Sequence, residues 1–533
     1  MALAQPIRLE RGSQRRIPTI SMAEWRWLGI VTVLLLVTTV LPLAVAAWRV
    51  PPGSVFPGYV VIARDAYVYQ SLWRAGWHGA WLFRSSYTSE ALPGILLYPW
   101  YLWSGHLVGG LPGAALYHAG RLAAAGALTG ASYALAAQLF RPTRLRRWAF
   151  TLGALGGGVG VLLPSVQLGP VTSRATEMAS PGSSVADLVA MAPHLPFAMA
   201  MMCAIFVIAL KRRTRRSWRL FAAGLALTLG LQLIYPQLAL LAVAVIGGWS
   251  ALRKVRPALW FAVAAATVQA PYLLYLLWVM RQHPEALAVV RPTLEVGDPF
   301  GFLVLSHLIA TALIMVALFS RRLRGDLLLP ALWIMGMTVF MFTPGIRGTL
   351  GRSFMASSIP FGLCAVPGLL LVLSRLQTRR WRRRVLTATL AASSLYGLFS
   401  LAQPLWIASF RLDPRAEYER ADEASLLARL APHVTDRTVV LTTYLDGLFV
   451  PAQTDARVYA GHPEMTIDAR RKATEAVEFF RVWPAGRRDA FLSANGIDYV
   501  LAPDPASSGR LTDDPMLQLV DRQGSAAIYK VTR

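Results

Sequence analysis

Long apolar runs, separated by short basic segments, dominate the first three quarters of the chain. A helix needs about 20 mostly apolar residues to cross about 30 Å of hydrocarbon. The pattern predicts eleven membrane-spanning helices, at 27–47, 113–139, 148–164, 194–210, 219–234, 236–251, 257–279, 301–319, 326–342, 357–374 and 385–404. From residue 413 onward the pattern is that of a soluble domain. We therefore predict a polytopic α-helical membrane protein with a C-terminal soluble α/β domain.

The composition also favours a membrane protein. Hydrophobic residues make up 55% of the 533 residues and charged residues only 15%, whereas soluble chains usually carry about 25% charged residues. The two cysteines, Cys203 and Cys364, lie in apolar runs and cannot form a disulfide framework. These figures exclude a disordered chain, a coiled coil, collagen and a disulfide-rich scaffold.

The net charge of +25 would suit a nucleic-acid binder, but its distribution does not. Residues 1–412 hold 38 Lys and Arg against 10 Asp and Glu, and residues 413–533 hold 15 against 18, so the two parts carry +28 and −3. The excess lies in clusters between apolar runs, at the N-terminus, 141–147, 211–219, 253–256, 321–324 and 375–384. We expect a lipid bilayer around the chain and no nucleic-acid partner.

The sidedness of the chain depends on the apolar segment 94–110. Cytoplasmic loops are enriched in Lys and Arg. All the basic clusters fall on one side only if 94–110 lies at the interface or re-enters the membrane, and we adopt that topology. It predicts a multi-pass cell-membrane protein with a cytoplasmic segment 1–26, a transmembrane domain 27–412 and an external domain 413–533. The first span lacks a cleavage pattern and should be retained.

The C-terminal region predicts a small α/β domain. Helical patterns at 415–431, 468–482 and 486–495 alternate with β-rich runs at 437–443, 456–461, 497–502, 517–521 and 526–532. This alternation favours a mostly parallel sheet. The region has no glycine-rich phosphate loop and no Cys/His metal spacing, and we interpret it as a lid or recognition module.

The long first external loop, 48–112, is the best place for chemistry, because loops of this length are usually functional. The segment 63–82 predicts an aromatic amphipathic helix that begins at Asp65. Its expected aromatic and apolar face holds Tyr69, Leu72, Trp73 and Trp77. Asp65 is either the N-cap of this helix or a reactive carboxylate near the bilayer surface, and the scarcity of acids in the loop favours the second role.

Here the sequence resembles the GT-C glycosyltransferases, integral membrane enzymes that usually take sugar from a polyprenyl-phosphate donor. The resemblance lies in RDAYVYQSLW (64–73), YTSE (87–90) and the overall order of loop, spans and soluble domain. LDGLFVPAQTDARVYAGHPEMT (445–466) and IDYVLAP (497–503) are similar to the external domain of an uncharacterised bacterial group within that family.

The resemblance implies that Asp65 is the general base, which takes the proton of the acceptor hydroxyl as it attacks the anomeric carbon. A carboxylate in a partly apolar site has a raised pKa, which suits this task. Family members with an Asp-x-Asp motif bind a metal there, but this chain reads Asp65-Ala66-Tyr67. No cofactor is therefore certain. A divalent ion such as Mg²⁺ or Mn²⁺ would need Glu90 as the second carboxylate.

A polyprenyl-phosphate leaving group needs positive charge at the external surface. GIRGTLGRSF (345–354) supplies Arg347 and Arg352, and arginine suits bidentate phosphate contacts. Both could instead anchor helix ends by snorkelling. Arg121, inside the second span, is either functional or pairs helices. Further candidates for substrate binding are Glu90, His194, Tyr69, Tyr235 and His462.

The expected function is therefore inverting transfer of a sugar from a polyprenyl-phosphate donor to a glycan, lipid or protein acceptor on the external face. Two alternatives stay open. A lipid-linked glycan transporter or flippase should show internal repeats with broken helices, and the sequence has no convincing repeat. A non-catalytic membrane scaffold with an external binding domain would not explain a long aromatic loop with a carboxylate.

Overall fold

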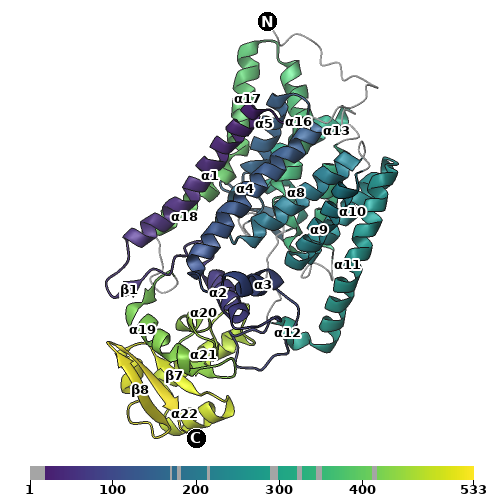
Figure 1. The fold of residues 1–533 in the computed structure, drawn as a ribbon. Helices are drawn as coiled ribbons and strands as arrows, with labels where there is room; N and C mark the ends of the chain where they lie inside the picture. The colour runs from purple at the N-terminus through teal and green to yellow at the C-terminus, as the bar shows by residue number, and fades with distance from the viewer. Residues whose placement is uncertain are drawn as a thin grey trace.

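The computed structural model describes residues 19–168, 171–176, 182–212, 217–288, 298–320, 327–343, 351–410 and 417–532. A bundle of long helices is joined at one end to a C-terminal α/β domain (Figure 1). The first long loop lies between these two parts, at the end of the bundle opposite to the start of the first helix (Figure 1).

The bundle is built from apolar helices whose lengths differ. Its helices are α1 (Met22–Trp48), α4 (Gly113–Leu139), α5 (Thr143–Ala154), α8 (His194–Arg212), α9 (Trp218–Ile234), α10 (Pro236–Leu252), α11 (Arg256–Gln282), α13 (Leu308–Phe319), α14 (Leu328–Phe342), α16 (Ser358–Arg375), α17 (Arg379–Ser393) and α18 (Leu395–Phe410). Among the described residues, five helices are long and apolar enough to cross a membrane, or six if the bent pair α17–α18 is one span. Each predicted span overlaps a helix of the bundle, and the count of eleven stays a prediction.

The span predicted at 148–164 is wrong in one respect, because it is not a continuous helix. Helix α5 ends at Ala154, just before the three glycines 156–158. A Cβ on Gly157 would lie 2.4 Å from the Cβ of Tyr396, and one on Gly158 would lie 1.6 Å from the carbonyl oxygen of Leu305. The apolar run is therefore partly a loop that other segments approach too closely for any side chain.

Two basic residues near helix ends, whose contacts the structure describes, lie at the same end of the bundle. Arg146, in the first turn of α5, forms a buried ion pair of 2.9 Å with Glu24 in the first turn of α1. Arg212, at the end of α8, donates to the carbonyl oxygen of Pro257 at the start of α11. These contacts agree with the grouping of charges on which the predicted topology rests.

The first loop contains two short helices, α2 (Ala63–Trp77) and α3 (Pro99–Val108), which pack against each other. The ten residues of α3 rise about 15 Å, roughly half the thickness of the hydrocarbon core. The helix within 94–110 is therefore too short to cross a membrane. Between α5 and α8 the chain forms the smaller elements β2 (Ser165–Leu168), β3 (Val171–Arg174) and α7 (Val185–Ala190).

The C-terminal domain is a five-stranded sheet with helices on both faces. The strands are β5 (Val439–Leu441), β6 (Arg457–Val458), β7 (Tyr499–Ala502), β8 (Leu517–Gln523) and β9 (Ala526–Val531), in the order β6-β5-β7-β9-β8. Helices α21 (Ala469–Arg481) and α22 (Ala485–Ala494) pack on one face, and α19 (Ala421–Leu430) and α20 (Val450–Gln453) pack on the other. The second face shares a continuous core with the first loop and the bundle.

The sheet is mixed, so the prediction of a mostly parallel sheet was wrong. Strand β5 runs parallel to β6 and β7, but β9 runs antiparallel to both β7 and β8. The last two strands are joined by only two residues, Gly524 and Ser525, and Gly524 has a φ of +51°. A connection of two residues permits only an antiparallel hairpin.

The first loop is fastened to this domain along edge strand β6. The N–H of Val458 donates to the carbonyl oxygen of Ser86 at 2.9 Å, and Thr88 forms an antiparallel bridge with Ala460. A second junction pairs β1 (Ser54–Val55) with β4 (Glu419–Arg420). The loop therefore covers a sheet edge that would otherwise expose unpaired backbone groups.

Candidate functional site

Asp65 lies in the first turn of α2 and is not the N-cap of that helix. The N-cap is Ile62, which has a left-handed φ of +48° and makes no side-chain capping bond. The positive end of the helix dipole favours a carboxylate in this turn. Asp65 is 39% exposed, so it can meet a substrate.

The C-terminal domain supplies the hydrogen-bond partner of Asp65. The Nε2 atom of His462 lies 3.3 Å from Oδ1 of Asp65, and the imidazole is almost completely buried. Residues that are nearly 400 positions apart in the sequence therefore meet at this point. Two of the predicted site residues come together here.

A chain of hydrogen bonds connects four further residues beside α2. His194, at the start of α8, is bonded through Nδ1 to the hydroxyl of Tyr101 at 2.6 Å and through Nε2 to the hydroxyl of Tyr235 at 3.3 Å. Arg352 donates from Nη1 to the same Tyr235 hydroxyl at 3.2 Å. Tyr69 stacks on Tyr101, with 4.4 Å between ring centroids. Tyr69, His194, Tyr235 and Arg352, all predicted site residues, therefore form one cluster.

Electrostatic interactions place Asp65 and Arg352 around the same tyrosines. Burial is the largest influence on Tyr235 and raises its pKa, while the charge of Arg352 lowers it and the charges of Asp65 and Glu464 raise it. The pKa of Tyr98 is also raised, mainly by burial, and responds to the same three charges. A carboxylate from the first loop, one from the C-terminal domain and a guanidinium from the bundle therefore act on the same two tyrosines.

Arg352 keeps its positive charge in this cluster. It lies in the short 3₁₀ helix Gly351–Phe354, between α14 and α16. Its interaction with Tyr235 raises the pKa of the guanidinium, and this outweighs the opposite effect of burial. Arg347, the other predicted phosphate ligand, lies outside the described residues.

Glu90 is engaged by a buried lysine of the C-terminal domain. Nζ of Lys472 lies 2.7 Å from the Glu90 carboxylate and also donates to Ser89 at 2.9 Å, and Thr88 donates to Glu90. Burial raises the pKa of Glu90, but these hydrogen bonds and the charge of Lys472 outweigh it, so the pKa is lowered overall. Glu90 thus helps to fasten the first loop to the C-terminal domain.

The described residues do not provide the ligand set that a divalent metal requires. Within those ranges, no group of three or more His, Cys, Asp or Glu side chains is placed to hold an ion. Asp65 contacts His462, and Glu90 contacts Lys472.

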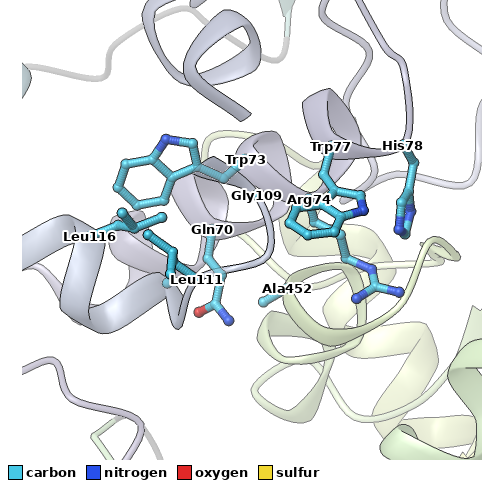
Figure 2. Close-up of a pocket in the computed structure, with 10 residues that line it drawn as sticks. Gln70, Trp73, Arg74, Trp77, His78, Gly109, Leu111, Leu116 and Ala452 are labelled. Carbon is cyan, nitrogen blue, oxygen red and sulfur yellow. The ribbon is translucent and has the colours of Figure 1, made fainter. Parts of the chain in front are cut away.

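A separate pocket of about 350 Å³ lies beside another part of α2 (Figure 2). It is lined by Gln70, Trp73, Arg74, Trp77, His78, Gly109, Leu111, Gly113, Leu116 and Ala452, and none of these is a predicted site residue. Its basic side chains are already engaged, because Arg74 and His78 both contact Asp455, at 2.9 and 2.7 Å. We therefore place the candidate site at Asp65 and not in this pocket.

Sequence reasoning missed Tyr98, Tyr101 and Lys472. Tyr98 is the N-cap of α3, with a left-handed φ of +50°, and Tyr101 lies in the first turn of that helix. The available signal was the local run of aromatic residues YPWY (98–101). Lys472 lies in a basic run, ARRK (469–472), where a side chain that is 1% exposed cannot be told from its solvated neighbours.

Arg121, the charged residue inside α4, holds neighbouring segments together. Its Nη1 donates to the carbonyl oxygen of Val189 in α7 at 2.9 Å, and its Nε donates to His118 at 3.3 Å. The structure thus supports the pairing role for Arg121.

No family model matches the chain, and no curated protein matches it. Solved structures of the Archaeoglobus fulgidus oligosaccharyltransferase are similar at 12% identity. The match to its apo form has a TM-score of 0.53 and covers 90% of this chain and 70% of that one. The match to its complex with Zn and sulfate has a TM-score of 0.52 and covers 89% and 67%. The match to the form tethered with an acceptor peptide containing the NVT sequon has a TM-score of 0.51 and covers 95% and 74%.

An oligosaccharyltransferase is a GT-C-type enzyme, and the match covers most of this chain. The chain has a GT-C-like fold. The expectation that followed from the first loop and the order of spans is confirmed at the level of the fold.

Proposed function

We propose that the protein is a membrane glycosyltransferase that moves a sugar from a polyprenyl-phosphate donor to an acceptor on the external face of the membrane. The GT-C-like fold, shared with an oligosaccharyltransferase, supports glycosyl transfer as the reaction class. The observation that carries the proposal is the convergence of Asp65 and Arg352 on one group of tyrosines. A base and a phosphate ligand are the two groups that this reaction needs.

Asp65 is the general base in this proposal. The acceptor oxygen forms a bond to the anomeric carbon while the bond between that carbon and the phosphate oxygen breaks. The leaving polyprenyl phosphate keeps the electron pair of the broken bond, and Asp65 takes the proton of the acceptor hydroxyl. Attack opposite to the leaving group inverts the anomeric centre.

Arg352 binds the donor phosphate, together with Arg347. Its guanidinium is held against Tyr235 and carries a full charge, so it stabilises the negative charge that grows on the phosphate during transfer. His194 stacks on Tyr235, and Tyr69 packs edge-on against His194, so that together they provide aromatic and polar surface for the donor. Glu90 and His462 lie where the first loop meets the C-terminal domain, and we place the acceptor beside this contact.

The test compares variants of the full chain in membranes that are supplied with a labelled polyprenyl-phosphate sugar. Asp65→Asn should lower kcat by about 10²- to 10⁴-fold, the usual cost of losing a general base. Arg352→Gln should raise the donor KM by about 10- to 100-fold, because a charged hydrogen bond to phosphate is lost.

The exposed ion pair Arg84–Asp436 supplies matched controls. These side chains are 64% and 73% exposed and lie 3.7 Å apart. Arg84→Gln and Asp436→Asn make the same chemical changes away from the site and should keep normal kinetics. Normal transfer by Asp65→Asn would refute the assigned base. A carrier or scaffold would show no transfer even in the unmodified chain.

A further inference from the structure

The hydrogen bonds of His462 determine which of its ring nitrogens carries the proton. The backbone N–H of Glu464 donates to Nδ1 of His462 at 3.2 Å. A ring nitrogen that accepts a hydrogen bond has no proton of its own, so Nε2 carries the proton of the neutral ring. That N–H lies 3.3 Å from Oδ1 of Asp65, where it donates to the carboxylate.

The turn that presents His462 is built to hold the imidazole in place. Oγ1 of Thr466 accepts from the N–H groups of Gly461 and His462, at 3.3 and 3.2 Å, and donates to the carbonyl oxygen of Tyr87 at 2.6 Å. A Cβ on Gly461 would lie 2.4 Å from the carbonyl oxygen of Gly447, so only glycine fits there. The turn is thus locked both to its own domain and to the first loop.

We propose that His462 is a positioning residue, whose neutral imidazole donates a hydrogen bond from Nε2 to Oδ1 of Asp65 and orients this carboxylate for proton abstraction. The proposal rests on the proposed function, because it gives Asp65 the role of base. His462 keeps its proton throughout, and Asp65 alone receives the proton of the acceptor.

This assignment separates His462 from two other roles that a histidine can have. A general base needs a free ring nitrogen that faces the substrate, but Nδ1 is occupied by Glu464 and Nε2 carries a proton. A metal ligand needs the lone pair of Nε2, and the bond from Glu464 selects the tautomer that lacks it. The imidazole is also almost completely buried, which suits contact with a protein group.

A consequence is that the C-terminal domain completes the candidate site. The first loop provides the carboxylate, and the C-terminal domain provides the donor that holds it. The first loop and the C-terminal domain are also held together by two further contacts. These are the ion pair between Lys472 and Glu90 and the bridge between Thr88 and Ala460. The carboxylate is therefore oriented only when the domain is docked on the loop.

The experiment measures kcat and donor KM of the full chain in the transfer assay for three substitutions of His462. The Gln amide nitrogen corresponds in reach to Nε2, so His462→Gln should keep kcat within about threefold. The shorter His462→Asn does not reach Asp65, and His462→Phe has no donor. Both should lower kcat by about 10- to 100-fold, the range for one hydrogen bond to a charged group, with donor KM unchanged. The exposed His433 serves as the matched control, since His433→Phe should behave normally.

Each outcome decides the question. Equal loss of kcat in His462→Gln, His462→Asn and His462→Phe would overturn the proposal, because the imidazole itself would then be required. Normal kcat in all three would overturn it as well. If His462→Phe fails to fold, the comparison of kcat between His462→Gln and His462→Asn still tests the proposal. Failure of the proposed function is distinct, since it would appear as full activity of Asp65→Asn or as no transfer by the unmodified chain.

Discussion

Glu419 is a buried carboxyl group at the point where the chain enters the C-terminal domain. It lies in β4 and is 3% exposed, and Nε2 of Gln453 donates to both of its oxygens, at 2.6 and 2.5 Å. Burial raises its pKa to about 7; the bonds from Gln453 oppose this shift, and the charge of Asp446 adds to it. The folded chain therefore keeps a proton on Glu419 at pH values where the unfolded chain has lost it.

Stability should consequently fall as the pH rises from about 4.5 to about 7. The ordinary pKa of 4.5 applies to the unfolded chain and a pKa of about 7 to the folded one, so the folded state binds more protons across this window. The shift corresponds to about 3 kcal/mol of unfolding free energy, lost progressively up to pH 7. The midpoint of thermal unfolding, measured at several pH values, should show a shallower slope for Glu419→Gln than for the unmodified chain.

Part of the pH slope should remain in Glu419→Gln. The nearby Glu423 is 1% exposed, and burial raises its pKa well above the ordinary value, so it contributes a slope of the same sign. Asp436→Asn, at a position that is 73% exposed, should leave the slope unchanged. Identical slopes for Glu419→Gln and the unmodified chain would contradict this interpretation of Glu419.

At the scale of elements, glycine sets how closely the helices approach each other. A Cβ on Gly368 in α16 would lie 1.8 Å from the carbonyl oxygen of Leu313 in α13. The same close approach occurs at Gly158, beside Leu305. In the membrane interior, small residues are the usual means of bringing two backbones together.

Gly368→Ala should therefore loosen the contact between α13 and α16. The added methyl group meets backbone atoms that cannot rotate away, and the cost of such overpacking is about 1–3 kcal/mol. The thermal unfolding midpoint of the detergent-solubilised chain should fall by several degrees. Gly130→Ala in α4 is the matched control, since a Cβ there meets nothing within 4 Å and should be neutral or slightly stabilising. Equal midpoints for the two variants would show that α16 can shift at no cost.

At the scale of the whole molecule, the basic residues near helix ends and the candidate site lie at opposite ends of the bundle. The described contacts of Arg146 and Arg212 join α5 to the start of α1 and the end of α8 to the start of α11. Helix α2, which carries Asp65, and the C-terminal domain lie at the end of the bundle opposite to the start of α1 (Figure 1). A membrane around the bundle would separate these two ends. The prediction of a cytoplasmic basic side and an external site depends on this arrangement.

Cysteine labelling in sealed right-side-out vesicles tests the sidedness. The native Cys203 and Cys364 are buried, so the unmodified chain should label weakly. A membrane-impermeant maleimide should label Ala506→Cys in the exposed part of α23 (Pro505–Gly509) without permeabilisation. Arg253→Cys, at the exposed α10–α11 turn, should react only after the vesicles are opened. The reverse order of labelling would place the site on the cytoplasmic side.

The sequence by itself determined the apolar helices, the strands and helices of the C-terminal domain, and the helix of the first loop that carries Asp65 near its start. These features depend on local periodicity and on the cost of placing polar residues in lipid, both of which can be recognised along the chain. It could not determine that α5 ends at Ala154 or that the sheet is mixed, because close packing at glycines 156–158 and pairing of β9 with β7 involve distant residues.

Only the tertiary structure decided which polar side chains meet. It brought Arg352 to Tyr235, Lys472 to Glu90 and His462 to Asp65. Each pair joins residues more than 100 positions apart in the sequence. Packing within the bundle brings Arg352 to Tyr235, whereas packing of the first loop against the C-terminal domain brings the other two pairs together. A sequence shows that such residues exist, but their distances follow from the core that holds the elements together.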